Sequence, residues 1–415
     1  MNHSVKVLRY AVSSFRKILI VPIIITILLV TLLHKKDDIY VILSSNKYFN
    51  VQNDSKVIPN ESQRKIEPKE IQPKLISIEF RYLNYTKAQV EKIKRDKKCY
   101  ELEKPVENVQ FIDDIEISPP KPDTSIFFIA TSCMNDGQFT LNARETCAIE
   151  SAATQNPNRD VYVLFVSPVG FTPNKSNSSL IGILKSFRNV HFRNLNIYDF
   201  SKNTPAEQWV TRDQIFLSPY FKTQMSDYIR FLTLYKFGGI YFDMDFIMIK
   251  SVDELPPNFM PLEKSDKINA SVLGFASNGT GHNIMDMILR ECIEKYDPNS
   301  WSHNGPGALR RVAQRICKAE YPKMIKRMLP EFCEGLKIMP QVEFFPLNPD
   351  EHINKDPQIV KQALKKVTDQ TVAIHLWSSL TREIDILKSE PDSFYTIMSK
   401  KFCPKSFGAS GLHFN

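Results

Sequence analysis

From residue 125 onwards the sequence alternates short apolar segments with segments of helical pattern, and this alternation constrains the fold more than any other feature. The apolar segments Ser125–Thr131, Asp160–Val166 and Val190–Leu195 have the length and composition of buried strands. Helical patterns lie between them, over Thr140–Thr154 and Ser178–Phe187. Strands that alternate with helices predict an α/β fold with a mainly parallel sheet flanked by helices. In such sheets, ligands bind beyond the carboxyl ends of the strands.

The first 122 residues have a different composition and predict a membrane anchor followed by a stem. All thirteen glycines of the chain lie between Gly137 and Gly411. The uncharged run Ile18–Leu33 follows four basic and no acidic side chains, and as a helix it spans about 24 Å. That length is near the ~27 Å hydrocarbon core of thin early secretory membranes. Because no small-residue cleavage site follows Leu33, we expect an uncleaved signal anchor and not a signal peptide.

The charge pattern places the rest of the chain in the lumen. Positive charge before the anchor orients the N-terminus towards the cytosol. We therefore expect a cytoplasmic tail (1–17), a transmembrane anchor (18–34) and a lumenal stem (35–122). The stem holds seven prolines and no glycine, which favours an extended chain. The alternative is a small helix near Lys87–Lys98 that packs on the folded body.

Lumenal residues meet an oxidising environment and the glycosylation machinery. Seven cysteines predict disulfides whose pairing the spacing does not give, and we expect Cys99, in the stem, to be the unpaired one. Half of the net charge of +8 lies in the first 34 residues, so the folded body has no basic surplus for nucleic acid. Seven glycosylation sequons follow the anchor, at Asn53, Asn60, Asn84, Asn174, Asn177, Asn269 and Asn278.

The segment Ser226–Lys250 is the most informative for function. Ser226 predicts the N-cap of a helix that ends at Gly238-Gly239, and a strand over Ile240–Ile249 follows at once. Asp243 and Asp245 stand two apart in that strand, so both carboxylates project to one face. Paired carboxylates suit Mg²⁺ or Mn²⁺, and such an ion neutralises the charge that develops on a departing diphosphate.

A second pair lies on the preceding helix, where Asp227 and Arg230 share a face at spacing i, i+3. An acid that accepts sugar hydroxyls and a base that binds phosphate would complement the metal. A phosphatase with the motif DxDx(T/V) is disfavoured, because Ile247 stands at the fifth position and the apolar residues continue beyond it.

The stretch Ser226–Asp245 resembles the DxD signature of the alpha-1,4-glycosyltransferases. Asn304–Leu309 and Ala373–Trp377 resemble the C-terminal blocks of the same family, so that the resemblance covers roughly residues 125–403. It implies a GT-A-type fold for nucleotide-diphospho-sugar transfer, with a nucleotide-sugar-binding half (123–260) and a C-terminal alpha-1,4-glycosyltransferase half (261–415).

The resemblance also implies roles for individual residues. Asp243, Asp245 and Arg230 are the expected catalytic residues, and Asp227, Arg230, Tyr241 and Trp377 are the expected donor-binding residues. Asp243, Asp245 and His375 are the expected metal ligands, although a histidine in an apolar strand is more often a core residue. Trp377 is equally consistent with a core position, and Asn304 with a simple turn. Ser378 stands where the family has an amide, so we assign it no role.

These roles predict a retaining, Mn²⁺- or Mg²⁺-dependent hexosyltransferase. It would transfer a sugar, with galactose as the first choice, from a UDP-sugar to a glycosphingolipid in the Golgi lumen. The new linkage would be alpha-1,4. The alternatives are transfer of N-acetylgalactosamine or N-acetylglucosamine to glycolipid or glycoprotein glycans, and a membrane-anchored lectin without turnover. We expect as partners the donor, the acceptor, the membrane and a second copy of the chain, but no nucleic acid.

Overall fold

The computed structural model describes residues 85–101, 109–133, 137, 140–171, 179–264, 267–319 and 333–415. The tail, the anchor and the first part of the stem, and the sequons at Asn53, Asn60, Asn84, Asn174 and Asn177, lie outside these ranges. Among the helices in the described ranges, none has both the length and the apolar character needed to cross a bilayer.

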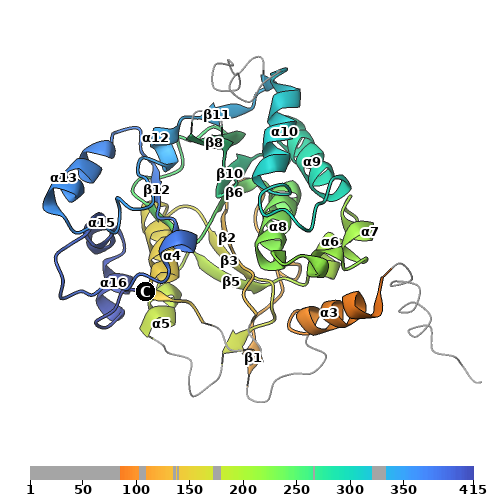
Figure 1. Ribbon diagram of the computed structural model, residues 1–415, viewed down its shortest axis with the longest axis horizontal. Coiled ribbons are helices and arrows are strands. Elements are labelled where there is room, and N and C mark those ends of the chain that lie inside the picture. The colour runs from red at the N-terminus through yellow and green to blue at the C-terminus, as the bar shows by residue number, and fades with distance from the viewer. Residues whose placement is uncertain are drawn as a thin grey trace, which may run out of the picture. The chain divides into compact units, whose positions relative to one another are not determined.

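A large twisted sheet forms the centre of the described body (Figure 1). Four parallel strands form one side of it, with β6 followed in order by β2, β3 and β5. On the other side of β6, β10 runs antiparallel to both β6 and β8, and β11 runs parallel to β8. The predicted α/β fold with a mainly parallel sheet is therefore confirmed, with β10 as an antiparallel insertion. The strands of this sheet are β2 (Ile126–Ala130), β3 (Val161–Phe165), β5 (Val190–Asn194), β6 (Gly239–Phe242), β8 (Phe259–Lys264), β9 (Lys267–Ile268), β10 (Val272–Phe275) and β11 (Lys337–Met339).

Alternate residues of a strand point to opposite sides of the sheet. Both faces of this sheet therefore carry apolar side chains, and helices cover both. Phe127 of β2 packs into the apolar cluster that contains α8, and Phe128 packs into the cluster that contains α4. Figure 1 shows α8, α9 and α10 on one side of the sheet and α4, α5 and α15 on the other. The helices are α3 (Lys87–Lys97), α4 (Ala143–Gln155), α5 (Ser179–Lys185), α6 (Ile197–Ser201), α7 (Glu207–Val210), η1 (Gln214–Leu217), α8 (Phe221–Phe237), α9 (Gly279–Glu294), α10 (Pro306–Ile316), α12 (Gln341–Phe344), α13 (Pro357–Lys366), α14 (Ser378–Thr381), α15 (Phe394–Phe402) and α16 (Pro404–Ala409).

Two small sheets complete the body. One pairs β1 (Gln110–Phe111) with β4 (Gly170–Phe171), and the other pairs β7 (Phe246–Met248) with β12 (Ala373–His375). The β7–β12 pair joins the middle of the chain to its C-terminal part, which also folds back on α4. Arg144 of α4 donates to the carbonyls of Thr381 and Phe414, and a disulfide links Cys147 to Cys403.

The tight connection between α8 and β6 confirms one prediction and corrects another. Gly238 and Gly239 have φ angles of 62° and 87°, which only glycine adopts readily, and a Cβ on Gly239 would lie 2.5 Å from the carbonyl oxygen of Ser125. Ser226, however, is not the N-cap. Helix α8 begins at Phe221, more than a turn earlier, so that Ser226 and Asp227 lie inside the helix.

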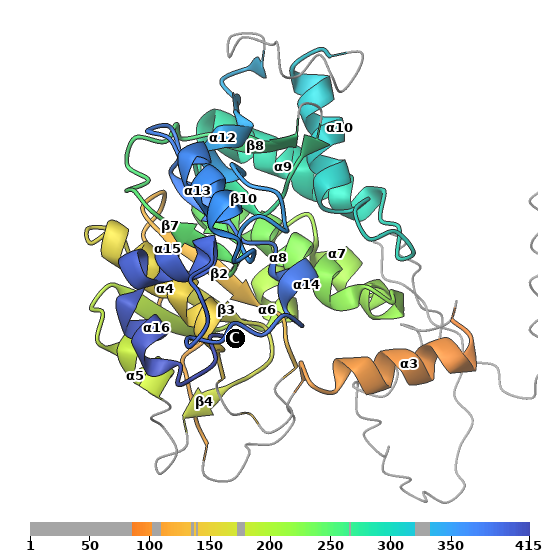
Figure 2. The same ribbon diagram turned by 60° about the vertical axis from the view of Figure 1, so that its left-hand side comes forward.

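The C-terminal part of the expected stem is packed on the body, as the alternative proposed. Helix α3, drawn in orange in Figure 2, has a capping box formed by Thr86 and Gln89. It packs against η1, and its buried Lys97 lies 3.2 Å from the fully buried carboxylate of Asp213. The expectation of an extended chain is therefore wrong for residues 85–101, because this segment has apolar and charged contacts on the body.

The prediction for the odd cysteine is also wrong. Cys99 follows α3 and pairs with Cys133, and Cys317 pairs with Cys333. The unpaired thiol is that of Cys292, which is buried in α9. Docking of α3 places Cys99 next to the body, and this contact was not visible in the cysteine spacing.

The buried pair of Lys97 and Asp213 predicts that α3 contributes strongly to stability. The Lys97→Met substitution keeps most of the packing volume but leaves the Asp213 carboxylate buried without its cation. We expect a loss of about 3–5 kcal/mol in the free energy of unfolding. Exposed Lys98→Met is the matched control and should change that free energy by no more than about 0.5 kcal/mol. Urea unfolding of the two variants measures both values, and equal values would contradict the role assigned to the pair.

Candidate active site

The two acids of the DxD motif lie in a turn and not in a continuous strand. Strand β6 ends at Phe242, and β7 begins at Phe246 in a different sheet. The expected strand Ile240–Ile249 is therefore interrupted at Asp243–Asp245, where the chain leaves the large sheet. The carboxylates approach each other because of this turn, and not because of strand alternation.

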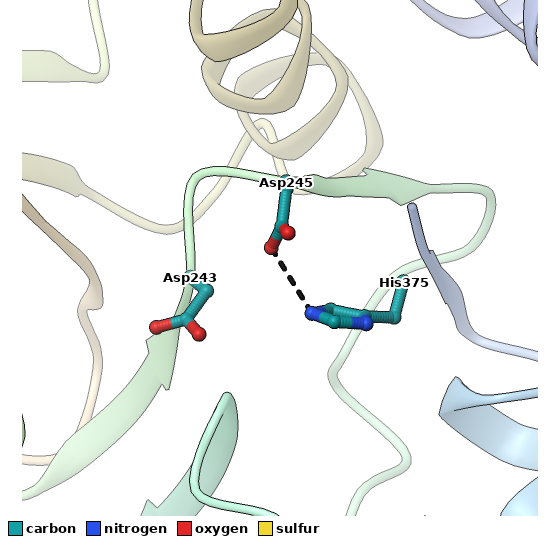
Figure 3. A group of neighbouring side chains, drawn as sticks. All are labelled: Asp243, Asp245 and His375. Carbon is teal, nitrogen blue, oxygen red and sulfur yellow. Dashed lines mark ion pairs between the residues drawn. The ribbon is translucent and has the colours of Figure 1, made fainter. Parts of the chain in front are cut away.

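Asp243, Asp245 and His375 converge on one space (Figure 3). One ligand atom from each residue can be chosen so that all three atoms lie within 4.8 Å of one another. His375 belongs to β12, which pairs with β7, and this pairing carries the histidine to the turn across 130 residues of sequence. The structure thus brings together all three of the expected metal ligands.

Asp245 is the more tightly held of the two acids. One of its carboxylate oxygens lies 3.2 Å from His375 Nε2, and the other accepts a hydrogen bond of 2.9 Å from the backbone N–H of Ser378. Although burial alone would raise it, these contacts hold the pKa of the Asp245 carboxyl below its usual value. Burial alone would lower the pKa of His375, but the Asp245 carboxylate raises it.

His375 and Trp377 form an aromatic wall beside Asp245. Their ring centroids lie 4.4 Å apart, and Phe246 and Phe345 also contact the imidazole. His375 Nδ1 is buried and has no hydrogen-bond partner among the described residues. Trp377 is half-buried and has a left-handed backbone with a φ of 52°, which redirects the chain into α14. This bend points the N–H of Ser378 at Asp245, a contact that no side-chain pattern in the sequence indicates.

Asp243 is the more open acid, with 31% of its side chain exposed. Its backbone N–H donates to the carbonyl of Ser271 at 2.7 Å, and its carboxylate accepts a hydrogen bond from the hydroxyl of Tyr241. Arg230 Nη1 lies 3.1 Å from the same carboxylate. Asp243 is therefore fixed by Tyr241 of β6, by Ser271 just before β10 and by Arg230 of α8, while one side of it stays accessible.

Arg230 is buried, and its donors all face acceptors of the protein. Its Nε donates to the carbonyl of Ser226, its Nη2 to the hydroxyl of Ser226 and its Nη1 to the carbonyl of Ala270. The guanidinium lies over the ring of Tyr241, at 4.5 Å from the centroid. Burial alone would lower the pKa of Arg230, but the neighbouring carboxylates, Asp243 above all, raise it. The side chain is a fixed charge at the base of the site.

Asp227 lies beside Arg230 and beneath a glycine. Its carboxylate is 3.4 Å from Arg230 Nη2, and burial raises the pKa of Asp227 to about 7 against the influence of that cation. A Cβ on Gly305 would lie 2.2 Å from Asp227 Oδ2, so only glycine fits this approach. The side chain of Asn304, the preceding residue, accepts a hydrogen bond from the backbone N–H of Asp297 and donates one to its carbonyl. Asn304 therefore shapes the loop.

Two family profiles match the chain. The profile for the glycosyltransferase sugar-binding region containing the DXD motif covers residues 142–260, and that for the alpha 1,4-glycosyltransferase conserved region covers residues 277–410. The chain belongs to the alpha-1,4-glycosyltransferase family. Together, the two matched ranges contain Asp227, Arg230, Asp243, Asp245 and His375.

Members of this alpha-1,4-glycosyltransferase family with known activities are distant from the chain. Human lactosylceramide 4-alpha-galactosyltransferase is 26% identical over 72% of this chain and 82% of its own length. The rat enzyme of the same name is 26% identical over 70% of this chain and 76% of its length. Human alpha-1,4-N-acetylglucosaminyltransferase is 23% identical over 63% of this chain and 74% of its length.

Two solved glycosyltransferase structures resemble this chain weakly. The galactosyltransferase LgtC, in complex with donor and acceptor sugar analogs, matches 68% of this chain and 95% of its own at a TM-score of 0.33 and 13% identity. The PaToxG glycosyltransferase matches 60% of this chain at a TM-score of 0.34.

The close approach of Gly305 to Asp227 predicts a strong effect of one methyl group. In Gly305→Ala, the added carbon would displace either the Asp227 carboxylate or the loop before α10, which we expect to cost about 1–3 kcal/mol of folding free energy. The control is Gly182→Ala in α5, where nothing lies within 4 Å of the new carbon. Urea unfolding compares the two, and a Gly305→Ala variant as stable as this control would show that the approach is not tight.

Proposed function

We propose that the protein is a retaining glycosyltransferase of the GT-A type. It transfers a hexose or N-acetylhexosamine, with galactose as the first choice, from a UDP-sugar to the terminal sugar of a glycosphingolipid in alpha-1,4 linkage. The observation that carries the proposal is the convergence of Asp243, Asp245 and His375 beside the buried Asp227–Arg230 pair, in a chain of the alpha-1,4-glycosyltransferase family. The names of the galactosyltransferase relatives favour this donor and acceptor.

The donor set of the cluster fits a divalent cation. Two carboxylates and one imidazole supply hard oxygen ligands and one nitrogen ligand, a combination that suits Mn²⁺, with Mg²⁺ as the alternative. His375 Nε2 and Asp245 Oδ1 face each other at 3.2 Å, in the space between the two acids and the imidazole (Figure 3). We assign Asp243, Asp245 and His375 as the residues that hold the ion. When bound, it would neutralise the charge that develops on the diphosphate of the leaving UDP.

Arg230 and Tyr241 support this role by positioning Asp243. Their contacts fix the carboxylate on one side and leave its accessible side for the ion and the diphosphate. The positive charge of Arg230 also contributes to the field at the site, where low solvent access strengthens electrostatic interactions. Contact of Asp227 with the donor sugar, and of Trp377 with the sugar or nucleotide, stay predictions. Asp227 lies beneath Gly305 and 3.4 Å from Arg230 Nη2, and we propose that it also acts on the site through Arg230.

Retention of configuration requires the acceptor hydroxyl to approach from the face that UDP leaves. Both the front-face route and the double displacement meet this requirement, and we keep both as mechanisms within retention.

The disulfides support the proposed location in the Golgi lumen. Three form among the described residues, which fits an oxidising compartment. Asn278, one of the predicted glycosylation sites, is exposed at the start of α9. The single-pass type II anchor at 18–34 and association into a homodimer stay predictions.

A donor panel tests the proposed function. With Mn²⁺, UDP-galactose, UDP-N-acetylgalactosamine and UDP-N-acetylglucosamine are each offered to a lactoside and to an acceptor that ends in N-acetylglucosamine. We expect transfer from UDP-galactose to the lactoside, with an alpha-1,4 linkage in the product by NMR. Transfer of an N-acetylhexosamine would select the alternative donors. A protein that neither transfers nor slowly hydrolyses any of these donors would instead be a lectin, and the proposal would fail.

A further inference from the structure

Two exposed aromatic side chains contact each other where the loop before α10 packs on the start of α8. In the described part of the chain, Tyr220 and Trp301 are the aromatic members of the exposed large apolar residues, with 42% and 46% of their surfaces accessible. Their rings are nearly parallel, with an interplanar angle of 21° and centroids 6.4 Å apart. Isolated exposed apolar residues are ordinary, but a stacked tyrosine and tryptophan form a flat apolar surface with polar edges.

Helix α8 links Tyr220 to the site. Tyr220 precedes Asp227 by seven residues, so the two lie on nearly the same face of the helix at about 10 Å along its axis. The turn at Gly238-Gly239 makes α8 run antiparallel to β6, so the start of α8 lies beyond the carboxyl end of that strand. Asp243 follows that end directly. Tyr220 therefore lies beyond the same end of the sheet as Asp243, about 10 Å from Asp227 along the helix axis.

The loop between α9 and α10, which contains Trp301, packs on the start of the same helix. Gln224 of α8 donates to the carbonyl of Ser300 at 3.0 Å, and Ser218 donates to that of Pro298 at 2.6 Å. The loop then brings Gly305, four residues after Trp301, against Asp227. The two aromatic residues thus belong to the same helix and loop that hold Asp227, and partly buried hydrogen bonds hold this loop on the helix.

We propose that Tyr220 and Trp301 form the stacking surface for a sugar ring of the acceptor glycan. This inference rests on the proposed function and adds the acceptor subsite to it. A pyranose has an apolar C–H face and polar edges, which match a flat aromatic surface flanked by exposed Asn299 and Ser302. The area of two side chains is enough to contact one or two sugar rings, and it is small for a protein–protein interface.

Kinetics with a soluble acceptor test the proposal. Methyl β-lactoside is used with the UDP-sugar that the donor panel selects, and the Mn²⁺-dependent affinity for UDP and the hydrolysis of the donor are measured in parallel. We expect Trp301→Ala and Tyr220→Ala each to raise the KM for the lactoside about tenfold or more, with kcat, UDP affinity and donor hydrolysis unchanged. Trp301→Phe and Tyr220→Phe keep an aromatic ring and should restore most of the affinity.

The matched control is Leu364→Ala, which removes an exposed apolar side chain from α13, on the other side of the sheet from α8. It should leave every parameter unchanged.

An unchanged KM for the lactoside in both alanine variants would overturn the proposal. A loss of activity that appears only with glycolipid in vesicles, and not with the lactoside, would also overturn it, because it would indicate contact with lipid. A parallel loss of UDP affinity would also overturn it, because the pair would then support the donor side. If the unmodified protein neither transfers nor hydrolyses the donor, the proposed function itself fails, and the inference fails with it.

Discussion

The buried guanidinium of Arg230 is the interaction on which the site depends. It lies where α8, β6 and β10 meet, and it contacts the carboxylates of Asp227 and Asp243 and the carbonyl of Ala270. A buried cation is costly unless it is paired and hydrogen-bonded, so this one requires its acceptors to stay in place. The DxD turn is thereby fixed before any donor binds. A site that is already organised needs little reorganisation free energy during the reaction.

A second constraint comes from the C-terminal part of the chain. His375 reaches Asp245 only because β12 pairs with β7, and the Ser378 N–H reaches it only because Trp377 bends the backbone. The disulfide between Cys147 and Cys403 and the contacts of Arg144 hold this part against α4. Residue 260, where we divided the sequence into halves, lies inside β8, and the large sheet takes strands from both sides of it. Residues from both halves are needed to complete the cluster.

The sequence predicted the strands and helices well where the pattern is local. The buried strands β2, β3 and β5 and the glycine turn after α8 follow from apolar runs and from backbone freedom, and they were found within a residue or two. Asp243 and Asp245 could be singled out because acids are unexpected in an apolar stretch, and Arg230 because it shares a helix face with Asp227. The start of α8 was misplaced, because Ser226 resembles a cap but serves as the acceptor for Arg230.

Features that depend on contacts between distant segments could not be read from the sequence. The pairing of Cys99 with Cys133 depends on the docking of α3, and the approach of Gly305 to Asp227 depends on a loop about eighty residues farther along the chain. Tyr220 and Trp301 have no common motif, and only the packing of the loop on α8 brings their rings together. Long-range packing of this kind has no signature in a single sequence.

Titration of UDP in the presence and absence of Mn²⁺ is the most direct test of the central claim that the DxD turn holds a metal for a nucleotide. The protein is compared with Asp243→Asn and Asp245→Asn, and Asp385→Asn serves as the control because Asp385 forms an exposed pair with His413 at 2.6 Å. We predict that Mn²⁺ strengthens UDP binding in the unmodified protein and in the control, and that this effect is lost in both DxD variants. Metal-dependent binding that persists in both variants would contradict the account.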